Sequence, residues 1–307
     1  MGTDTDWQTI SAGGFHVCAT KSGGALYCWG LNSTGQVGDG SGTDRFAPVL
    51  VGTTSDWAVV AAGGYHTCGI RNDASLWCWG WNSFGEVGDG TQGEGTEALE
   101  PIHVAPGQGF RSLAAGDYHA CAIADDGSLW CWGANAEGQI GNGGSSDVLT
   151  PTQVGGSTDW VAVRAGQYHT CGLREGGSLW CWGANERGQC GWAPPGGAAE
   201  PRAVGPGEYT SVTTGQQHTC AIDADGSLWC FGLNDSGQLG IGSNTDASTP
   251  AQVEPGTKWR SVAAGDWHTC GEKLDGTVSC WGWNHFGQLG NGTTSDDTTN
   301  WTPTPVD

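Results

Sequence analysis

The chain has 307 residues, and its 32 acidic against 11 basic side chains give a formal net charge of -21 at pH 7. That excess of negative charge repels phosphate backbones and anionic lipid headgroups, so we expect no nucleic-acid partner. No apolar run approaches the ~18 residues that a membrane helix needs, and we therefore expect no membrane insertion. The 56 glycines and 18 tryptophans indicate a chain rich in loops and β-strands.

One pattern recurs six times along the chain, in copies that start near residues 7, 57, 110, 160, 209 and 259. The second copy contains, in order, an apolar segment from Trp57, the segment Ala-Gly-Gly-Tyr-His-Thr-Cys ending at Cys68, Leu-Trp-Cys-Trp-Gly ending at Gly80, and Pro-Ile-His-Val ending at Val104. Each segment has the length of a short strand, and turn residues separate them. No copy sustains a helical period long enough to connect parallel strands, so we expect antiparallel sheets.

Twelve of the 13 cysteines form six pairs whose members lie ten positions apart. The pairs are Cys18 and Cys28, Cys68 and Cys78, Cys121 and Cys131, Cys171 and Cys181, Cys220 and Cys230, and Cys270 and Cys280. This spacing differs from a short zinc knuckle, and no second pair completes a tetrahedral set within a copy. We therefore expect six disulfides, each within one copy, in a secreted or cell-surface protein. Cys190 stands where other copies carry Val, Ile or Leu, and is predicted to be a buried, unpaired thiol.

The spacing also predicts how the paired cysteines are arranged in a hairpin. Two strands joined by a tight turn at Asp125-Asp126-Gly127 place Cys121 opposite Cys131 when Asp126 is the midpoint. Residues directly opposed in an antiparallel pair are close enough for a disulfide. The same register places Ala120 opposite Trp132, and small residues oppose tryptophans in other copies too. Both faces of the hairpin should thus be filled, as in a sheet that lies between two neighbouring sheets.

The segments Ala-Gly-Gly-Tyr65-His66-Thr, Leu-Trp-Cys-Trp-Gly80 and Gly138-Gln139-Ile140-Gly141 resemble the repeat of the regulator-of-chromosome-condensation family. The resemblance extends from Trp7 to Val306 and implies an all-β fold, a β-propeller of four-stranded antiparallel blades. Family members usually have seven blades, whereas six copies predict a six-bladed propeller formed by residues 1–307 as a single domain. We expect the final Pro303–Val306 segment to join the first blade as its missing strand and so to close the propeller.

No set of residues in the sequence supports catalysis, so we expect no enzyme, no catalytic residue and no cofactor. Six histidines recur at one position, namely His16, His66, His119, His169, His218 and His268. A residue repeated in every blade is expected to serve the blade by hydrogen bonding to local backbone rather than to ligate a metal. The Asp-rich loops at 38–44 and 291–297 could hold Ca²⁺ through oxygen ligands, but they lack the spacing of a known calcium loop, and solvated loops are the favoured interpretation.

Aromatic residues give the candidate binding site. The residue before the repeated histidine is aromatic in five copies, at Phe15, Tyr65, Tyr118, Tyr168 and Trp267. Copies two and six add Trp81 with Phe84 and Trp283 with Phe286, at positions where most other copies have small or aliphatic residues. Exposed Trp and Tyr clusters are favoured anchors for partners, although these side chains could instead wedge between blades. On the expected closure, the added aromatics could form one patch across blades six, one and two.

The sequence is best explained by a monomeric, non-enzymatic scaffold that binds a protein partner through these aromatic residues. It resembles secreted propellers that inhibit β-lactamases, in which loops on one face plug the enzyme. The chromatin and nucleotide-exchange roles of the family do not suit so acidic a chain. A multivalent lectin that binds a glycan through repeated pockets is an alternative, because similar pockets gain from avidity. A purely structural module of a larger cell-surface protein is another.

Overall fold

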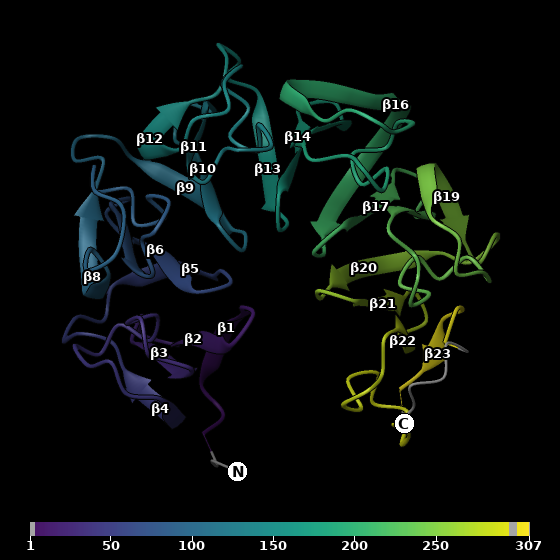
Figure 1. Ribbon diagram of the computed structural model, residues 1–307. Helices are drawn as coiled ribbons and strands as arrows, with labels where there is room; N and C mark the ends of the chain where they lie inside the picture. Colours follow the sequence, from purple (N-terminus) through teal and green to yellow (C-terminus); the bar gives the residue numbers. More distant parts are fainter. Residues whose placement is uncertain (1–3, 295–299, 307) are drawn as a thin grey trace. The chain divides into compact units, whose positions relative to one another are not determined.

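The computed structural model describes residues 4–294 and 300–306, and these consist of β-strands joined by turns and loops, with no helix among them (Figure 1). The chain divides into two compact units. Unit 1 comprises Met1–Ala136 and Asn142–Asp159, and unit 2 comprises Glu137–Gly141 and Trp160–Asp307. In the described ranges no helix is long and apolar enough to cross a bilayer.

Unit 1 contains three four-stranded antiparallel blades, each built from consecutive strands. The first blade has β1 (Trp7–Ala12), β2 (His16–Lys21), β3 (Leu26–Gly30) and β4 (Arg45–Leu50). The second has β5 (Trp57–Ala62), β6 (His66–Arg71), β7 (Leu76–Gly80) and β8 (Ala98–Val104). The third has β9 (Phe110–Ala115), β10 (His119–Ala124), β11 (Leu129–Gly133) and β12 (Val148–Gln153).

Unit 2 contains three more blades, and one long strand serves two of them. The fourth blade has β13 (Trp160–Ala165), β14 (His169–Arg174), β15 (Ser178–Gly183) and the start of β16 (Ala198–Thr214). The fifth has the end of β16 with β17 (His218–Asp223), β18 (Leu228–Gly232) and β19 (Ala247–Val253). The sixth has β20 (Trp259–Ala264), β21 (His268–Lys273), β22 (Val278–Gly282) and β23 (Thr304–Pro305).

The central hairpin of each blade has the predicted register. Cys121 pairs with Cys131 and Ala120 with Trp132 between β10 and β11. Gly127 closes the turn with a φ of 84°, a conformation that favours glycine. All six expected disulfides are present, each between cysteines ten positions apart, and Cys190 is buried and unpaired. The predicted pairing of the twelve cysteines and the predicted unpaired Cys190 are thus confirmed.

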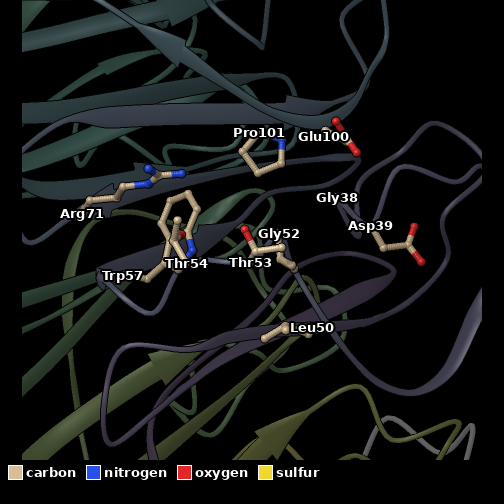
Figure 2. A pocket seen from close by; sticks show the side chains of 11 residues that line it. Gly38, Asp39, Leu50, Gly52, Thr53, Thr54, Trp57, Arg71, Glu100 and Pro101 are labelled. Atoms are coloured by element: carbon tan, nitrogen blue, oxygen red, sulfur yellow. The ribbon is translucent and has the colours of Figure 1, made fainter.

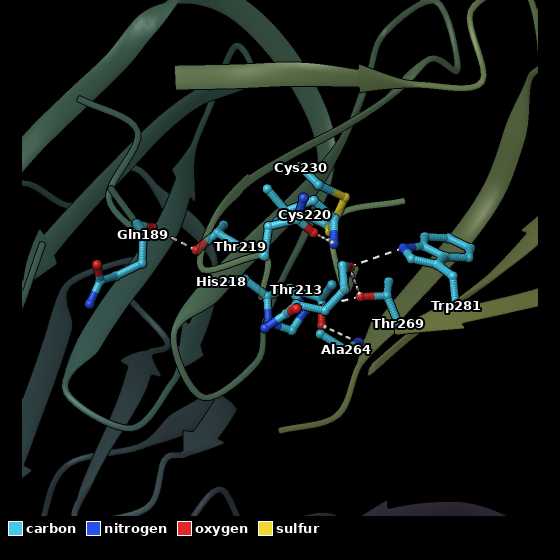
Figure 3. Close-up of a disulfide and its surroundings, with 12 residues drawn as sticks. Gln189, Thr213, His218, Thr219, Cys220, Cys230, Ala264, Thr269 and Trp281 are labelled. Atoms are coloured by element: carbon cyan, nitrogen blue, oxygen red, sulfur yellow. Dashed lines mark hydrogen bonds between the residues drawn. A yellow bond between two sulfur atoms is a disulfide. The ribbon is translucent and has the colours of Figure 1, made fainter. Parts of the chain in front are cut away.

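Three of the repeated histidines, His16, His169 and His218, bond through their side chains to the next blade and not, as predicted, to local backbone. The Nε2 atom of His218 lies 2.9 Å from the hydroxyl of Thr269, which in turn donates to the Gln238 carbonyl (Figure 3). The indole of Trp281 donates to the same carbonyl. His16 and His169 make the equivalent bonds to Thr67 and Thr219. The histidine is the first residue of the second strand of its blade. From that position its ring contacts the adjacent sheet.

The expected closure by the C-terminal strand is wrong. β23 pairs antiparallel with β22 of the sixth blade, with Thr304 opposite Cys280. The first blade obtains its fourth strand, β4, from its own copy of the repeat. Each blade thus coincides with one repeat, and the segment that follows the third strand always pairs with that strand, so the first blade has no vacancy for a distant strand.

Candidate binding surface

The backbone fixes the position of the residue before each repeated histidine. Its carbonyl accepts a hydrogen bond from the amide of the residue that follows the third strand of the same blade. In the second blade the Trp81 amide donates to the Tyr65 carbonyl over 3.0 Å, and in the third blade the Ala134 amide donates to the Tyr118 carbonyl over 2.8 Å. An aromatic residue at both positions of one blade therefore places two side chains next to each other, as at Tyr65 and Trp81.

Five aromatic side chains of unit 1 contact one another near these positions. We call them the aromatic cluster, which consists of Phe15, Tyr65, Trp81, Phe84 and Tyr118. Trp81 lies at its centre, with ring centroids 5.6 Å from Tyr65, 5.5 Å from Phe84 and 5.6 Å from Tyr118. Phe15 extends the cluster through Tyr65 at 5.0 Å, and Phe84 also contacts Tyr118 at 6.0 Å. The cluster thus crosses the first, second and third blades.

The cluster is open to solvent at both ends. Phe15 is 56% exposed and Phe84 is 38% exposed, while Tyr65, Trp81 and Tyr118 are partly buried. The ring pairs between Trp81 and its three neighbours have edge-to-face geometry, which holds each ring in a defined orientation. Rings held in this way lose little conformational entropy when a ligand covers them.

A buried asparagine fixes the loop that carries Phe84. The Asn82 side chain accepts a hydrogen bond from the Val87 amide over 3.0 Å and donates to the Thr91 carbonyl over 3.2 Å. Equivalent asparagines hold the same loop in other blades, for example Asn234 in unit 2. The loop at 82–88 is thus a rigid support that is common to the repeat, and Phe84 is a local addition to it.

Glu86 lies in this loop, directly behind the cluster. It is fully buried, and its Oε2 atom accepts a hydrogen bond from the Phe84 amide over 2.9 Å. Its Oε1 atom is buried without a hydrogen-bond partner among the described residues. Burial raises the pKa of Glu86 to about 7, Asp147 adds to the rise, and the bond from Phe84 opposes it.

Sequence reasoning did not identify Glu86, although the signal was present. The equivalent residue is glutamine in the five other copies, at Gln36, Gln139, Gln189, Gln238 and Gln288. In each of these the Oε1 atom accepts the same backbone amide, over 2.9 to 3.1 Å. A single carboxylate among five amides at one equivalent position distinguishes the second blade from all others.

The predicted aromatic residues of unit 2 form a separate group on the sixth blade. Trp283 stacks on His285 with centroids 5.7 Å apart and contacts Phe286 at 5.3 Å, and Phe286 is 76% exposed. The Trp267 carbonyl accepts the Trp283 amide, and the Trp267 side chain is partly buried. Tyr168 on the fourth blade is also partly buried, and its carbonyl accepts the Ala184 amide.

A pocket of about 440 Å³ lies elsewhere in unit 1, between residues of the first and second blades (Figure 2). Trp57, Arg71 and Glu100 line it, together with Asp39. The Arg71 guanidinium sits 3.8 Å from the Trp77 ring centroid and forms an ion pair with Asp56. The Arg71 guanidinium is thus already paired within the protein, as is usual for a structural contact.

The carboxylates of the first Asp-rich loop are also engaged within the protein. Asp39 forms an ion pair with Arg45 and accepts the Ser41 amide over 3.0 Å, and Asp44 accepts the Asn32 amide over 2.9 Å. Within the described ranges, no group of three or more His, Cys, Asp or Glu side chains is arranged to hold a metal ion. Asp296 and Asp297 of the second such loop lie outside the described residues.

The blades and their disulfides define a class of protein, a β-propeller built from six four-stranded repeats. The chain belongs to the RCC1-like domain family, whose family model matches residues 55–307. Models of the regulator of chromosome condensation (RCC1) repeat also match residues 23–70 and 7–36. The expected family and the expected propeller fold are therefore confirmed.

Known proteins are similar to the chain in sequence or in fold. The ultraviolet-B receptor UVR8 of Arabidopsis thaliana is 32% identical over 136 residues, which are 44% of this chain and 31% of UVR8. The structure of human WBSCR16 superimposes with a TM-score of 0.89 at 20% identity, covering 100% of this chain and 83% of that one. Yeast RCC1 (Prp20), solved bound to Kap60, superimposes with a TM-score of 0.86 at 21% identity, covering 98% and 75%. These structures establish the fold, and the match spans about a third of the length of UVR8.

Proposed function

We propose that this chain is a non-enzymatic, secreted or cell-surface scaffold that recognises a protein partner through the aromatic cluster of unit 1. The observation that carries the proposal is the meeting of five aromatic side chains from three blades around Trp81, with Phe15 and Phe84 exposed. Large aromatic side chains that are rigid and partly exposed are the typical anchors of protein interfaces. The six repeats also support a single domain over residues 1–307.

Differences between the blades favour a protein over a repeated glycan. The position of Trp81 holds Leu31, Ala134, Ala184 or Leu233 in four other copies, so the cluster does not recur around the repeats. A lectin with equivalent pockets would repeat its binding residues. Yeast RCC1 (Prp20) has been solved in complex with the protein Kap60, so a propeller of this fold can serve as a protein-binding scaffold.

The disulfides support the proposed location. Each of the six bonds closes a hairpin within a buried region, and bonds of this kind form and persist in oxidising compartments. The net charge of -21 supports the exclusion of nucleic acid and anionic membrane surfaces as partners.

A photo-crosslinking experiment tests the proposal. A benzoyl-phenylalanine placed at Phe84 should crosslink one discrete protein from the native extracellular medium, and Trp81→Ala should remove the crosslink, because truncating an anchor commonly costs ~2 kcal/mol or more. The matched control places the crosslinker at Phe46, which is 96% exposed and lies on β4 outside the cluster.

Equal crosslinking from positions 84 and 46, or a crosslink that persists in Trp81→Ala, would overturn the proposal. Circular dichroism of each variant checks that the loss of the crosslink does not come from unfolding. A glycan array run with the same variants covers the lectin alternative, and glycan binding that depends on Trp81 would replace the protein partner.

A further inference from the structure

The substitution at Glu86 has no structural purpose that glutamine does not already serve. Gln36, Gln139 and Gln238 accept the equivalent backbone amide, and their second side-chain atom, Nε2, is buried without a partner just as Oε1 of Glu86 is. The two side chains have the same shape, and they therefore fill the same place in the loop. What glutamate adds at this position is a negative charge.

A buried charge of this kind weakens the fold. Glu86 is fully buried, its Oε1 atom has no donor among the described residues, and its Oε2 atom accepts the Phe84 amide. Removing a carboxylate from water without a compensating cation is unfavourable. The second blade alone bears this penalty, and it is also the blade that supplies Trp81 and Phe84 to the aromatic cluster.

The charge and the rings attract the same kind of ligand. The faces of Trp, Tyr and Phe carry a negative quadrupole that attracts Lys and Arg side chains. The buried Glu86 carboxylate is bonded to the backbone of Phe84, whose ring centroid lies 5.5 Å from that of Trp81, so its charge lies close to the rings of the cluster. The cluster itself contains no basic residue, and the net charge of -21 attracts cationic partners from a distance.

We propose that the aromatic cluster binds a Lys or Arg side chain of a basic protein partner, and that Glu86 gives this surface its preference for a cation. The inference rests on the proposed function and specifies the chemistry of its partner. The sixth blade provides an internal comparison, since it presents Trp283 and Phe286 with Gln288 behind them. By the same reasoning the sixth-blade group has no such preference.

Cation binding should strengthen as the pH rises through 7, because the Glu86 carboxyl then loses its proton. Burial, with a smaller contribution from the charge of Asp147, raises its pKa to about 7. The neighbouring His16 and His66 stay neutral over this range, because burial lowers the pKa of His16 to about 4 and that of His66 to about 3.

The test uses a pair of neutral-ended peptides, acetyl-Gly-Arg-Gly-amide and its citrulline analogue, which has nearly the same shape without the charge. Binding is followed by the NMR shift of the Trp81 indole N–H, assigned with Trp81→Phe, at pH 8 and physiological salt. The arginine peptide should bind about tenfold more tightly than the citrulline peptide. Glu86→Gln should reduce this preference to about twofold or less.

Two further variants make the test decisive. Gln288→Glu should create a preference for arginine at the Trp283 indole, because it places a carboxylate at the position that accepts the Phe286 amide, as Glu86 accepts the Phe84 amide. Glu86→Gln is expected to fold, since five equivalent positions already hold glutamine, and the NMR spectrum itself reports folding. Equal binding of the two peptides to the wild type, or an arginine preference that survives Glu86→Gln, would overturn the inference. Neither result would affect the crosslinking test at Phe84, so the two proposals fail separately.

Discussion

At the scale of single residues, His66 differs from three of the other repeated histidines in its hydrogen bonding. His16, His169 and His218 each contact a threonine hydroxyl of the next blade. Both ring nitrogens of His66 are buried without a hydrogen-bond partner among the described residues. The third blade carries Ala120 where four other blades carry threonine, so the hydroxyl that would bond to His66 is missing from the position opposite its ring.

We predict that Ala120→Thr stabilises the protein by about 1 kcal/mol. The new hydroxyl would bond to His66 Nε2 and donate to the Glu86 carbonyl, as Thr67 does to the Gln36 carbonyl. Thr67, Thr170, Thr219 and Thr269 are fully buried at the same position, so the fold accommodates the side chain. Urea unfolding measures the gain, and Thr219→Ala is the matched control, which should lose a similar amount. A lower midpoint for Ala120→Thr would contradict this account.

Glu86→Gln should raise the free energy of unfolding at neutral and alkaline pH. The pKa of Glu86 is about 7 in the folded protein and 4.5 as its ordinary value, so the native state binds a proton that the unfolded chain has lost. Wild-type stability therefore falls as the pH rises from 4.5 through 7, by roughly 3 kcal/mol in total. The advantage of the variant should be small at pH 4.5 and complete at pH 8. A difference in unfolding free energy between variant and wild type that does not change with pH would show that burial does not destabilise the ionised carboxylate.

At the scale of elements, the hairpins were predictable and the order of strand pairing at the C-terminus was not. A ten-residue spacing, a Gly turn and small residues opposite tryptophans are local signals, and they determined the register of β10 with β11. The pairing of β23 with β22 depends on which sheet edge is free. In the first blade the edge of β3 is already paired with β4, which the Pro-x-x-Val segment of the first copy supplies.

Removal of residues 303–307 should therefore weaken the sixth blade. Cys280 lies opposite Thr304, and the Val306 amide donates to the Val278 carbonyl, so the deletion exposes the edge of β22. We expect faster amide hydrogen exchange in Val278–Gly282, because an edge strand without its neighbour opens more readily. The amides of β3 are the internal control and should exchange as before. Increased exchange in β3 instead would restore the closure model.

At the scale of the whole molecule, the aromatic residues could be identified from the sequence but their assembly could not. Phe15, Tyr65 and Tyr118 share one repeat position, so each was found without a structure. The contact of Tyr118 with Trp81 and Phe84 joins the third blade to the cluster, and it depends on how adjacent blades pack. The aromatic cluster lies across blades one to three of unit 1, and the expected patch across blades six, one and two stays a prediction.

Buried histidines should make the protein sensitive to acid. Burial lowers the pKa of His16 to about 4 and those of His66, His169 and His218 to about 3, against an ordinary value of 6.5. The native state thus binds fewer protons than the unfolded chain, so these four groups contribute stability above pH 6.5 that is lost as the pH falls towards their folded pKa values. Glu86 has the opposite effect on stability, because its raised pKa makes the native state bind a proton, but it offsets only about one of the four histidines.

We therefore expect the free energy of unfolding to fall by roughly 4 kcal/mol for each pH unit of acidification near pH 5. At that pH the unfolded chain binds about three more protons than the native protein. Urea unfolding followed by circular dichroism at pH 7, 6 and 5 measures the slope. His66→Gln should reduce the slope by about one proton, because it removes one buried imidazole that makes no hydrogen bond through its ring nitrogens to the described residues. A stability that stays constant from pH 6.5 to pH 5 would mean that these histidines gain protons without unfolding, and that the sheets can open locally around them.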